Sequence, residues 1–91
     1  MKHAHEKNLK RVSLELGGKS PFIIMDDVNL DDYAMGTAYQ ALFFNKGECC
    51  AAASWTFVHE KKYDEFVEKA VKLAKTAVMG DPLLNTTTQG P

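Results

Sequence analysis

The segment Phe22-Ile23-Ile24-Met25-Asp26-Asp27 decides the fold. Its continuous apolar run, Phe22 to Met25, is typical of a strand that is covered on both faces. The two aspartates end the strand. Asn29 then follows as the predicted N-cap of a helix, and Asp31 and Asp32 suit the positive end of that helix. The segment therefore predicts a strand–helix unit of an α/β fold.

Two more strand-like runs lie on either side of this unit. Before it, Val12, Leu14 and Leu16 alternate with polar residues, which predicts a short half-buried strand that ends at Gly17-Gly18. After it, Trp55-Thr56-Phe57-Val58 is rich in aromatic and β-branched residues, which predicts a third strand.

Apolar residues at helical spacing predict two amphipathic helices. The first follows Asn29 and stops at Asn45-Lys46-Gly47, and the second runs from about Lys62 to Ala77. Glu65/Lys69 and Glu68/Lys72 are i,i+4 pairs on the exposed face of the second helix. The predicted buried stripes are Leu30, Tyr33, Ala34, Thr37, Ala38, Ala41 and Leu42 in the first helix, and Tyr63, Phe66, Val67, Ala70, Leu73, Ala74 and Ala77 in the second.

The resulting order is β-β-α-β-α, which favours parallel strands joined by right-handed crossovers. Three short strands and two helices cannot cover both faces of such a sheet. We therefore expect the chain to be part of a domain rather than a complete one.

The composition is that of an ordinary globular protein, with 91 residues, 45% hydrophobic residues and a net charge of −1. This charge gives no electrostatic footprint for nucleic acid or for an anionic membrane. No apolar run reaches the roughly 18 residues of a spanning helix. We expect a cytoplasmic, reducing compartment, and neither a nucleic-acid nor a membrane partner.

The two cysteines lie in the small-residue segment Gly47-Glu48-Cys49-Cys50-Ala51-Ala52. Adjacent cysteines bridge only with strain, and there is no second pair for a zinc site. His3 and His5 fall in a terminal tail, so we expect no metal site. From the residues alone, the cysteines are either small buried hydrophobes, a thiolate nucleophile or a redox pair.

Glu15 is the second residue of interest, because it ends the first predicted strand on the polar face, beside a glycine turn. A carboxylate in that position usually just faces solvent. A nucleophile and a general base on neighbouring loops of one sheet would form a site for covalent catalysis.

At both motifs the sequence resembles the aldehyde dehydrogenase superfamily. The glutamate signature is present from Leu14 to Pro21 as Leu-Glu-Leu-Gly-Gly-Lys-Ser-Pro, and the cysteine signature as Phe43-Phe44-Asn45-Lys46-Gly47-Glu48-Cys49-Cys50. The strand and helix start between them also agree, as do Tyr63-Asp64-Glu65-Phe66, Gly80-Asp81-Pro82 and Gln89-Gly90-Pro91. The resemblance covers about Asn8 to Pro91.

The resemblance implies a role for four residues. Cys50, two places after Glu48, is the expected nucleophile, and Glu15 is the expected general base. Leu16 and Gly17 are expected beside the nicotinamide of NAD or NADP. The implied reaction oxidises a small-molecule aldehyde to a carboxylic acid through a thiohemiacetal and a thioester on Cys50. A short helix opening at Cys50 would favour its thiolate.

The resemblance also implies a place for the chain in a larger enzyme. Residues 1–17 are expected to lead in from the cofactor-binding domain, and residues 18–91 to form part of the catalytic domain. The oxyanion asparagine and most of the cofactor site are expected outside the chain, and the full-length enzyme is expected to be a homo-oligomer. Trp55 stands where many members carry arginine. The alternative function is a short non-catalytic remnant of the fold that acts as a structural or interaction module.

Overall fold

The computed structural model describes residues 2–6 and 8–90. Its elements follow the order α1, β1, α2, β2, α3, with a short 3-10 turn after α2. Their bounds are Lys2–His5 for α1, Pro21–Ile24 for β1, Asp32–Phe43 for α2, Phe44–Gly47 for the 3-10 turn, Trp55–Val58 for β2 and Glu60–Ala74 for α3.

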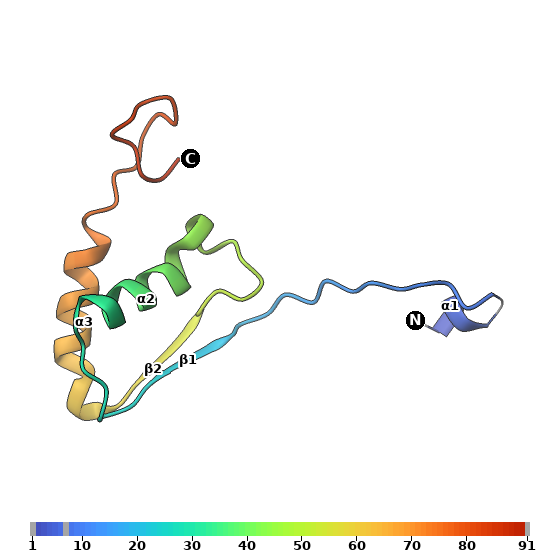
Figure 1. Cartoon of the computed structure of the whole chain (residues 1–91), viewed down its shortest axis with the longest axis horizontal. Coiled ribbons are helices and arrows are strands. Elements are labelled where there is room, and N and C mark those ends of the chain that lie inside the picture. The colour runs from blue at the N-terminus through green and yellow to red at the C-terminus, as the bar shows by residue number, and fades with distance from the viewer. Residues whose placement is uncertain (1, 7, 91) are drawn as a thin grey trace.

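The two strands form a parallel sheet in which Pro21 is paired with Trp55 and Ile24 with Val58. The α/β class and the parallel pairing are thus as predicted. Backbone hydrogen bonds extend the pairing beyond both ends of the strands, because Trp55 N–H donates to Ser20 O at 3.3 Å and His59 N–H donates to Ile24 O at 2.9 Å. As a result, α2 connects two neighbouring parallel strands (Figure 1).

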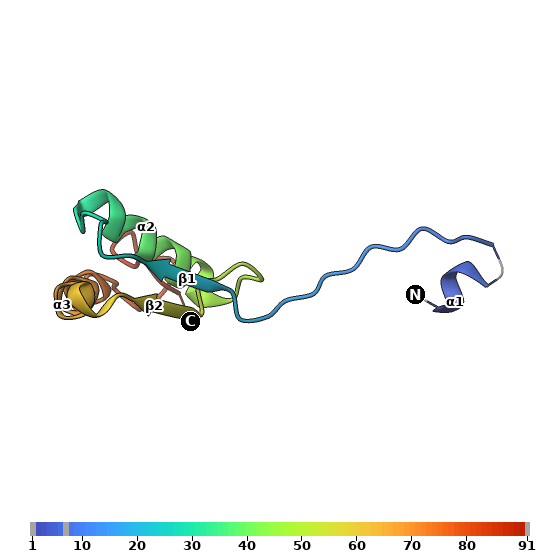
Figure 2. The same cartoon turned by 90° about the horizontal axis from the view of Figure 1, so that it is seen from below.

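The strand predicted from Val12 to Leu16 is wrong for this chain. Residues 9–20 form no helix or strand and run as an extended arm, whose N-terminal part lies away from the rest of the chain in both views (Figures 1 and 2). Val12 and Leu14 are about half exposed, and Leu16 is 82% exposed. An alternating pattern becomes a strand only when a neighbouring strand accepts its backbone hydrogen bonds, and in the described part of the chain none lies beside this arm.

The first helix begins later than predicted. Asp31, not Asn29, is the N-cap, and its Oδ1 accepts a hydrogen bond from Ala34 N–H at 2.9 Å. The predicted stripe was also partly wrong, because Tyr33 is 85% exposed whereas Met35 is buried. Met35 forms a core cluster with Ile24 and Leu30. Residues of both strands, of the loop after β1 and of α3 pack against this cluster: Phe22, Val28, Val58, Phe66, Ala70 and Leu73.

The second helix starts at Glu60, two residues before the predicted Lys62. It ends at Ala74, three residues before the predicted Ala77. The side-chain nitrogen of His59 caps it by accepting from Lys61 N–H. Both predicted ion pairs are confirmed, with N–O distances of 2.7 Å for Lys69–Glu65 and 2.6 Å for Lys72–Glu68. The hydrogen bond from Lys69 lowers the pKa of the Glu65 carboxyl, and the bond from Lys72 does the same for Glu68.

The sheet is covered on one face only. Phe22, Ile24 and Val58 pack against the core cluster, so both helices cover that face. The opposite face, which we call the open sheet face, carries Pro21, Ile23, Trp55 and Phe57. Ile23 is 64% exposed and Trp55 58% exposed. The prediction that Phe22 to Met25 is covered on both faces therefore fails within this chain, because no second layer of helices is present among the described residues.

The exposed surface is also larger than that of a compact domain. The accessible surface is 7692 Å², whereas a compact monomer of this mass exposes about 5,300 Å². The radius of gyration is 18.6 Å, against about 12 Å for a compact domain of this length. Only Ile24, Leu30, Met35, Ala52 and Ala53 are buried apolar residues in the described part of the chain. No helix there is long and apolar enough to cross a bilayer.

We expect the isolated 91-residue chain to be aggregated or molten, because five buried apolar residues cannot offset the conformational entropy of so many ordered ones. Thermal unfolding followed by near-ultraviolet circular dichroism should show no sharp transition. A cooperative transition from a dilute monomer would contradict this expectation.

Candidate active site

A left-handed turn carries the chain out of α2 and into the cysteine segment. Asn45 and Lys46 have φ values of 49° and 62°, and Gly47 has a φ of 79°. Asn45 stabilises the turn twice, since its carbonyl accepts from Glu48 N–H and its side-chain amide donates to Glu48 O, both at 3.0 Å. A Cβ on Gly47 would lie 3.2 Å from the Leu42 carbonyl, so glycine suits this position in both space and conformation.

Cys50 lies in an exposed turn directly after this segment. Ala52 N–H donates to Cys49 O at 3.0 Å, which places Cys50 at the centre of a single turn. Cys50 is exposed, Cys49 is half-buried, and both are free thiols. The short helix expected to open at Cys50 is not formed, because Ala53 N–H instead donates to Ala41 O at 2.9 Å, which directs the chain toward β2.

The glutamate signature lies beside the cysteine segment at the C-terminal end of the arm. A Cβ built on Gly17 would lie 3.9 Å from Cys50 Cβ, so the backbone at Gly17 runs directly beside the thiol-bearing residue. Glu15 and Leu16 come just before this contact and are exposed. The structure thus brings together two of the four predicted site residues, Gly17 and Cys50. Neither Glu15 nor Cys50 has a side-chain hydrogen bond within the described residues, so both side chains could still contact groups from outside the chain.

The backbone at Gly17-Gly18 could accept a planar ring. Nothing lies within 4 Å of a Cβ built on Gly18, and the only neighbour of one built on Gly17 is Cys50. Open backbone of this kind lets a flat group approach closely. The residues present therefore fit the expected place of a nicotinamide. Across residues 2–6 and 8–90, His, Cys, Asp and Glu side chains form no group of three that could hold a metal ion.

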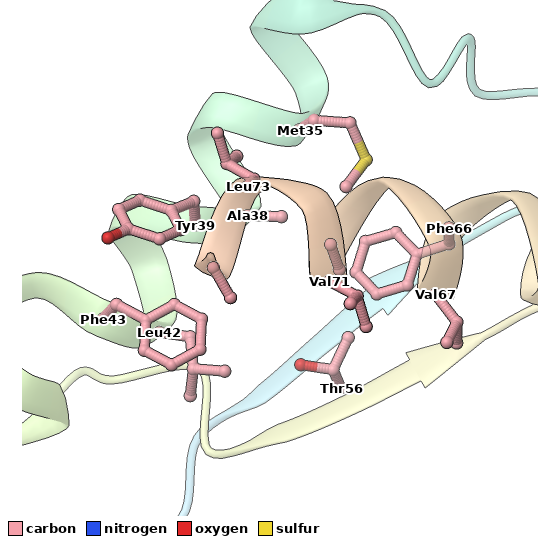
Figure 3. Close-up of a pocket in the computed structure, with 12 residues that line it drawn as sticks. Met35, Ala38, Tyr39, Leu42, Phe43, Thr56, Phe66, Val67, Val71 and Leu73 are labelled. Atoms are coloured by element: carbon pink, nitrogen blue, oxygen red, sulfur yellow. The ribbon is translucent and has the colours of Figure 1, made fainter. Parts of the chain in front are cut away.

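An apolar groove lies away from this site. It has a volume of about 290 Å³ and runs between α2, α3 and β2, with Met35, Tyr39, Phe66 and Val71 among its lining residues (Figure 3). Its walls are almost entirely apolar and include neither Cys50 nor Glu15. We read it as uncovered core surface rather than as a substrate pocket.

Sequence reasoning predicted no contact for the C-terminal loop. Met79 and Gln89 form a parallel β-bridge, and Thr88 N–H donates to Val78 O at 2.9 Å, so residues 78–89 close into a loop. The side chain of Gln89 also reaches Phe43 O at the end of α2. No local pattern could reveal this contact, because its partners are 46 residues apart.

Comparison with known proteins gives the family. The model described as "Aldehyde dehydrogenase family" matches residues 1–91. The chain belongs to the aldehyde dehydrogenase family. Among curated members, the human protein named "Aldehyde dehydrogenase, mitochondrial" is 58% identical over 88 residues, which are 97% of this chain and 17% of that protein. The protein named "Aldehyde dehydrogenase 9" from Polyandrocarpa misakiensis is 53% identical over 91 residues, and the chain covers 40% of it.

Solved aldehyde dehydrogenases share the fold of this segment. The NAD+ complex of the Bacillus cereus aldehyde dehydrogenase superposes with a TM-score of 0.84 at 40% identity, covering 99% of this chain and 18% of that one. A structure described as an NADP-dependent enzyme of E. coli superposes with a TM-score of 0.87, also at 40% identity, with the same coverage. The chain thus spans less than a fifth of these aldehyde dehydrogenases.

Proposed function

We propose that this chain supplies the nucleophile and the general base of an NAD(P)-dependent aldehyde dehydrogenase, which oxidises a small-molecule aldehyde to a carboxylic acid. The observation that carries the proposal is the approach of Gly17 to Cys50, at 3.9 Å between a Cβ built on the glycine and the cysteine Cβ. It joins the glutamate and cysteine signatures in space, as a shared site requires.

Cys50 starts the reaction. Its thiolate attacks the aldehyde carbon, the carbon–sulfur bond forms, and the carbonyl oxygen becomes the oxyanion of a thiohemiacetal. The backbone N–H of Cys50 and an asparagine from outside the chain are the proposed donors to this oxyanion. The exposure of Cys50 suits attack on a substrate that enters from solvent.

Leu16 and Gly17 are the proposed contacts to the cofactor within this chain. The nicotinamide of NAD or NADP, when bound, supplies the hydride acceptor that turns the thiohemiacetal into a thioester. The open backbone of Gly17 would let the ring lie close to Cys50. Most of the cofactor site is proposed to lie outside the chain.

Glu15 completes the cycle. Its carboxylate takes a proton from water as the water oxygen attacks the thioester carbon. The carbon–sulfur bond then breaks, which releases the carboxylic acid and returns Cys50 as a thiolate. Glu15 lies on the exposed arm two residues before Gly17, within the part of the chain that approaches the cysteine.

The wider setting follows from the same proposal. Residues 1–17 lead in from the cofactor-binding domain, and residues 18–91 form part of the catalytic domain of a homo-oligomeric enzyme. The extended arm over residues 9–20 supports this division, because it has the form of a connection rather than of a packed element. The cytoplasmic location stays a prediction, and several of the curated relatives are named mitochondrial.

A second candidate is a non-catalytic structural or interaction module. The observation that favours it is the exposed apolar surface, with Ile23 64% exposed on the open sheet face. This function would require a stable, monodisperse state of the 91-residue chain by itself. The molten behaviour expected above therefore separates the two candidates.

A chimaera tests the proposed function without depending on the stability of the isolated chain. Residues 1–91 replace the matched 88 residues of the human aldehyde dehydrogenase, and NADH or NADPH formation is followed with a panel of aldehydes. We expect aldehyde-dependent formation of the reduced cofactor. A second chimaera that exchanges only residues 14–50 keeps the test open if the larger exchange fails to fold. A folded chimaera without activity would overturn the proposal.

A further inference from the structure

The C-terminal end of α2 is bonded to two other parts of the chain, the residues after the cysteines and the C-terminal loop. The last carbonyls of a helix have no partner within the helix and must be satisfied from elsewhere. Ala41 O accepts from Ala53 N–H at 2.9 Å, and Phe43 O accepts from the side-chain Nε2 of Gln89 at 3.2 Å. The first donor lies three residues after Cys50, whereas the second comes from the C-terminal loop.

The turn that follows α2 is strained. Asn45 and Lys46 hold left-handed φ values of 49° and 62°, which side chains other than glycine rarely adopt. Such conformations persist only where the surrounding structure holds them in place. The contact of Gln89 with Phe43 O lies two residues before Asn45, and Cys50 lies four residues after Lys46.

Gln89 is itself firmly placed. Its backbone N–H donates to Val78 O at 3.1 Å, its carbonyl accepts from Gly80 N–H at 3.3 Å, and it forms the β-bridge with Met79. The side chain is half-buried, and the loop that carries it ends beside α2 (Figure 1). With both backbone groups bound inside the loop, the side-chain amide is free to bridge to the helix.

We propose that Gln89 is a positioning residue for Cys50, an inference that rests on the proposed function. By donating to Phe43 O, Gln89 holds the C-terminal end of α2 in place. The left-handed turn starts from this end and leads to Cys50. It touches neither substrate nor cofactor in this scheme, and acts through Phe43 and the turn. A displacement of about 1 Å at a reacting group can cost a hundredfold in rate.

The test compares Gln89→Met with Gln40→Met in the chimaera. Methionine keeps the length of glutamine but cannot donate a hydrogen bond to Phe43 O. Gln40 is an exposed glutamine on α2, the helix that Gln89 contacts. We expect Gln89→Met to lower kcat about tenfold to a hundredfold with little change in KM. Alkylation of Cys50 by iodoacetamide, which needs no alignment with an aldehyde, should not slow. Amide hydrogen exchange of residues 45–53 should accelerate. Gln40→Met should change none of these.

The outcomes separate this inference from the proposed function. If the folded parent chimaera forms no reduced cofactor with any aldehyde, the proposed function fails, although faster exchange over residues 45–53 in Gln89→Met would still support the anchoring. If the parent is active and Gln89→Met keeps its kcat and its exchange rates, only the role of Gln89 is overturned. Equal losses in both variants would also overturn it, because the effect would then not be specific to the Phe43 contact.

Discussion

Replacing Cys50 by serine in the chimaera is expected to lower dehydrogenase turnover at least about a thousandfold. Serine keeps the size of the side chain, but its hydroxyl has almost no anionic form near neutral pH, and in the proposed mechanism Glu15 acts on the hydrolytic water rather than on the nucleophile. Cys50 is exposed in a turn beside Gly17, so the substitution should not disturb packing. Initial rates of NADH formation measure the effect.

Cys49→Ser is the matched control. Cys49 is adjacent, half-buried and also a free thiol, yet it is one place short of the position after Glu48 that the signature assigns to the nucleophile. We expect this variant to retain most of its turnover. Equal loss in both variants would show that the signature is placed one residue out. Loss in Cys49→Ser alone would make Cys49 the nucleophile.

Glu15→Gln is expected to stop the reaction after its first half. Glutamine keeps the shape and hydrogen-bonding capacity of glutamate but cannot accept a proton. If Glu15 acts only on the hydrolytic water, the variant should still release about one NADH per active site in a rapid burst. Its steady-state rate should then fall about 10²–10⁴-fold. Stopped-flow absorbance resolves the two phases.

Glu48→Gln is the control for this variant, since it makes the same change on an exposed carboxylate two residues before Cys50. The resemblance implies no role for Glu48 in the chemistry, so turnover should be retained. A Glu15→Gln variant whose burst is itself slow would mean that Glu15 deprotonates Cys50 rather than the water.

The local elements were predictable where the chain itself supplies their partners. Trp55–Val58 forms a strand as predicted, because β1 lies beside it. The pairs along α3 formed as predicted because they depend only on i,i+4 spacing. The arm over residues 11–16 has an equally good strand pattern, but its hydrogen-bonding partner is absent from the described chain. Periodicity predicts which residues can pair, not whether a neighbour is there to accept them.

The buried face of α2 shows a related limit. The sequence stripe through Tyr33 and Thr37 is regular, yet both are exposed, whereas Met35 enters the core. Which side of an apolar helix is buried depends on where its neighbours lie. Here α3 covers the side that carries Met35, and the side that carries Tyr33 faces an open groove beside β1.

The candidate site was also predictable only in part. The two signatures predict that Glu15, Gly17 and Cys50 belong together, and the structure places Gly17 beside Cys50. The roles of Cys50, Glu15, Leu16 and Gly17 stay predictions. The contact between Gln89 and Phe43 was not foreseen, because a side-chain bond across 46 residues leaves no periodic or motif signal.

One measurement tests the central claim most directly, namely that this chain carries an aldehyde dehydrogenase nucleophile and its base. The Glu15→Gln chimaera is mixed with aldehyde and NAD, quenched in acid within the burst phase, digested and sequenced by tandem mass spectrometry. The account predicts an acyl group on Cys50, carried through a thioester, and none on Cys49. A quenched sample in which Cys50 bears no acyl group, although the burst has occurred, would contradict it.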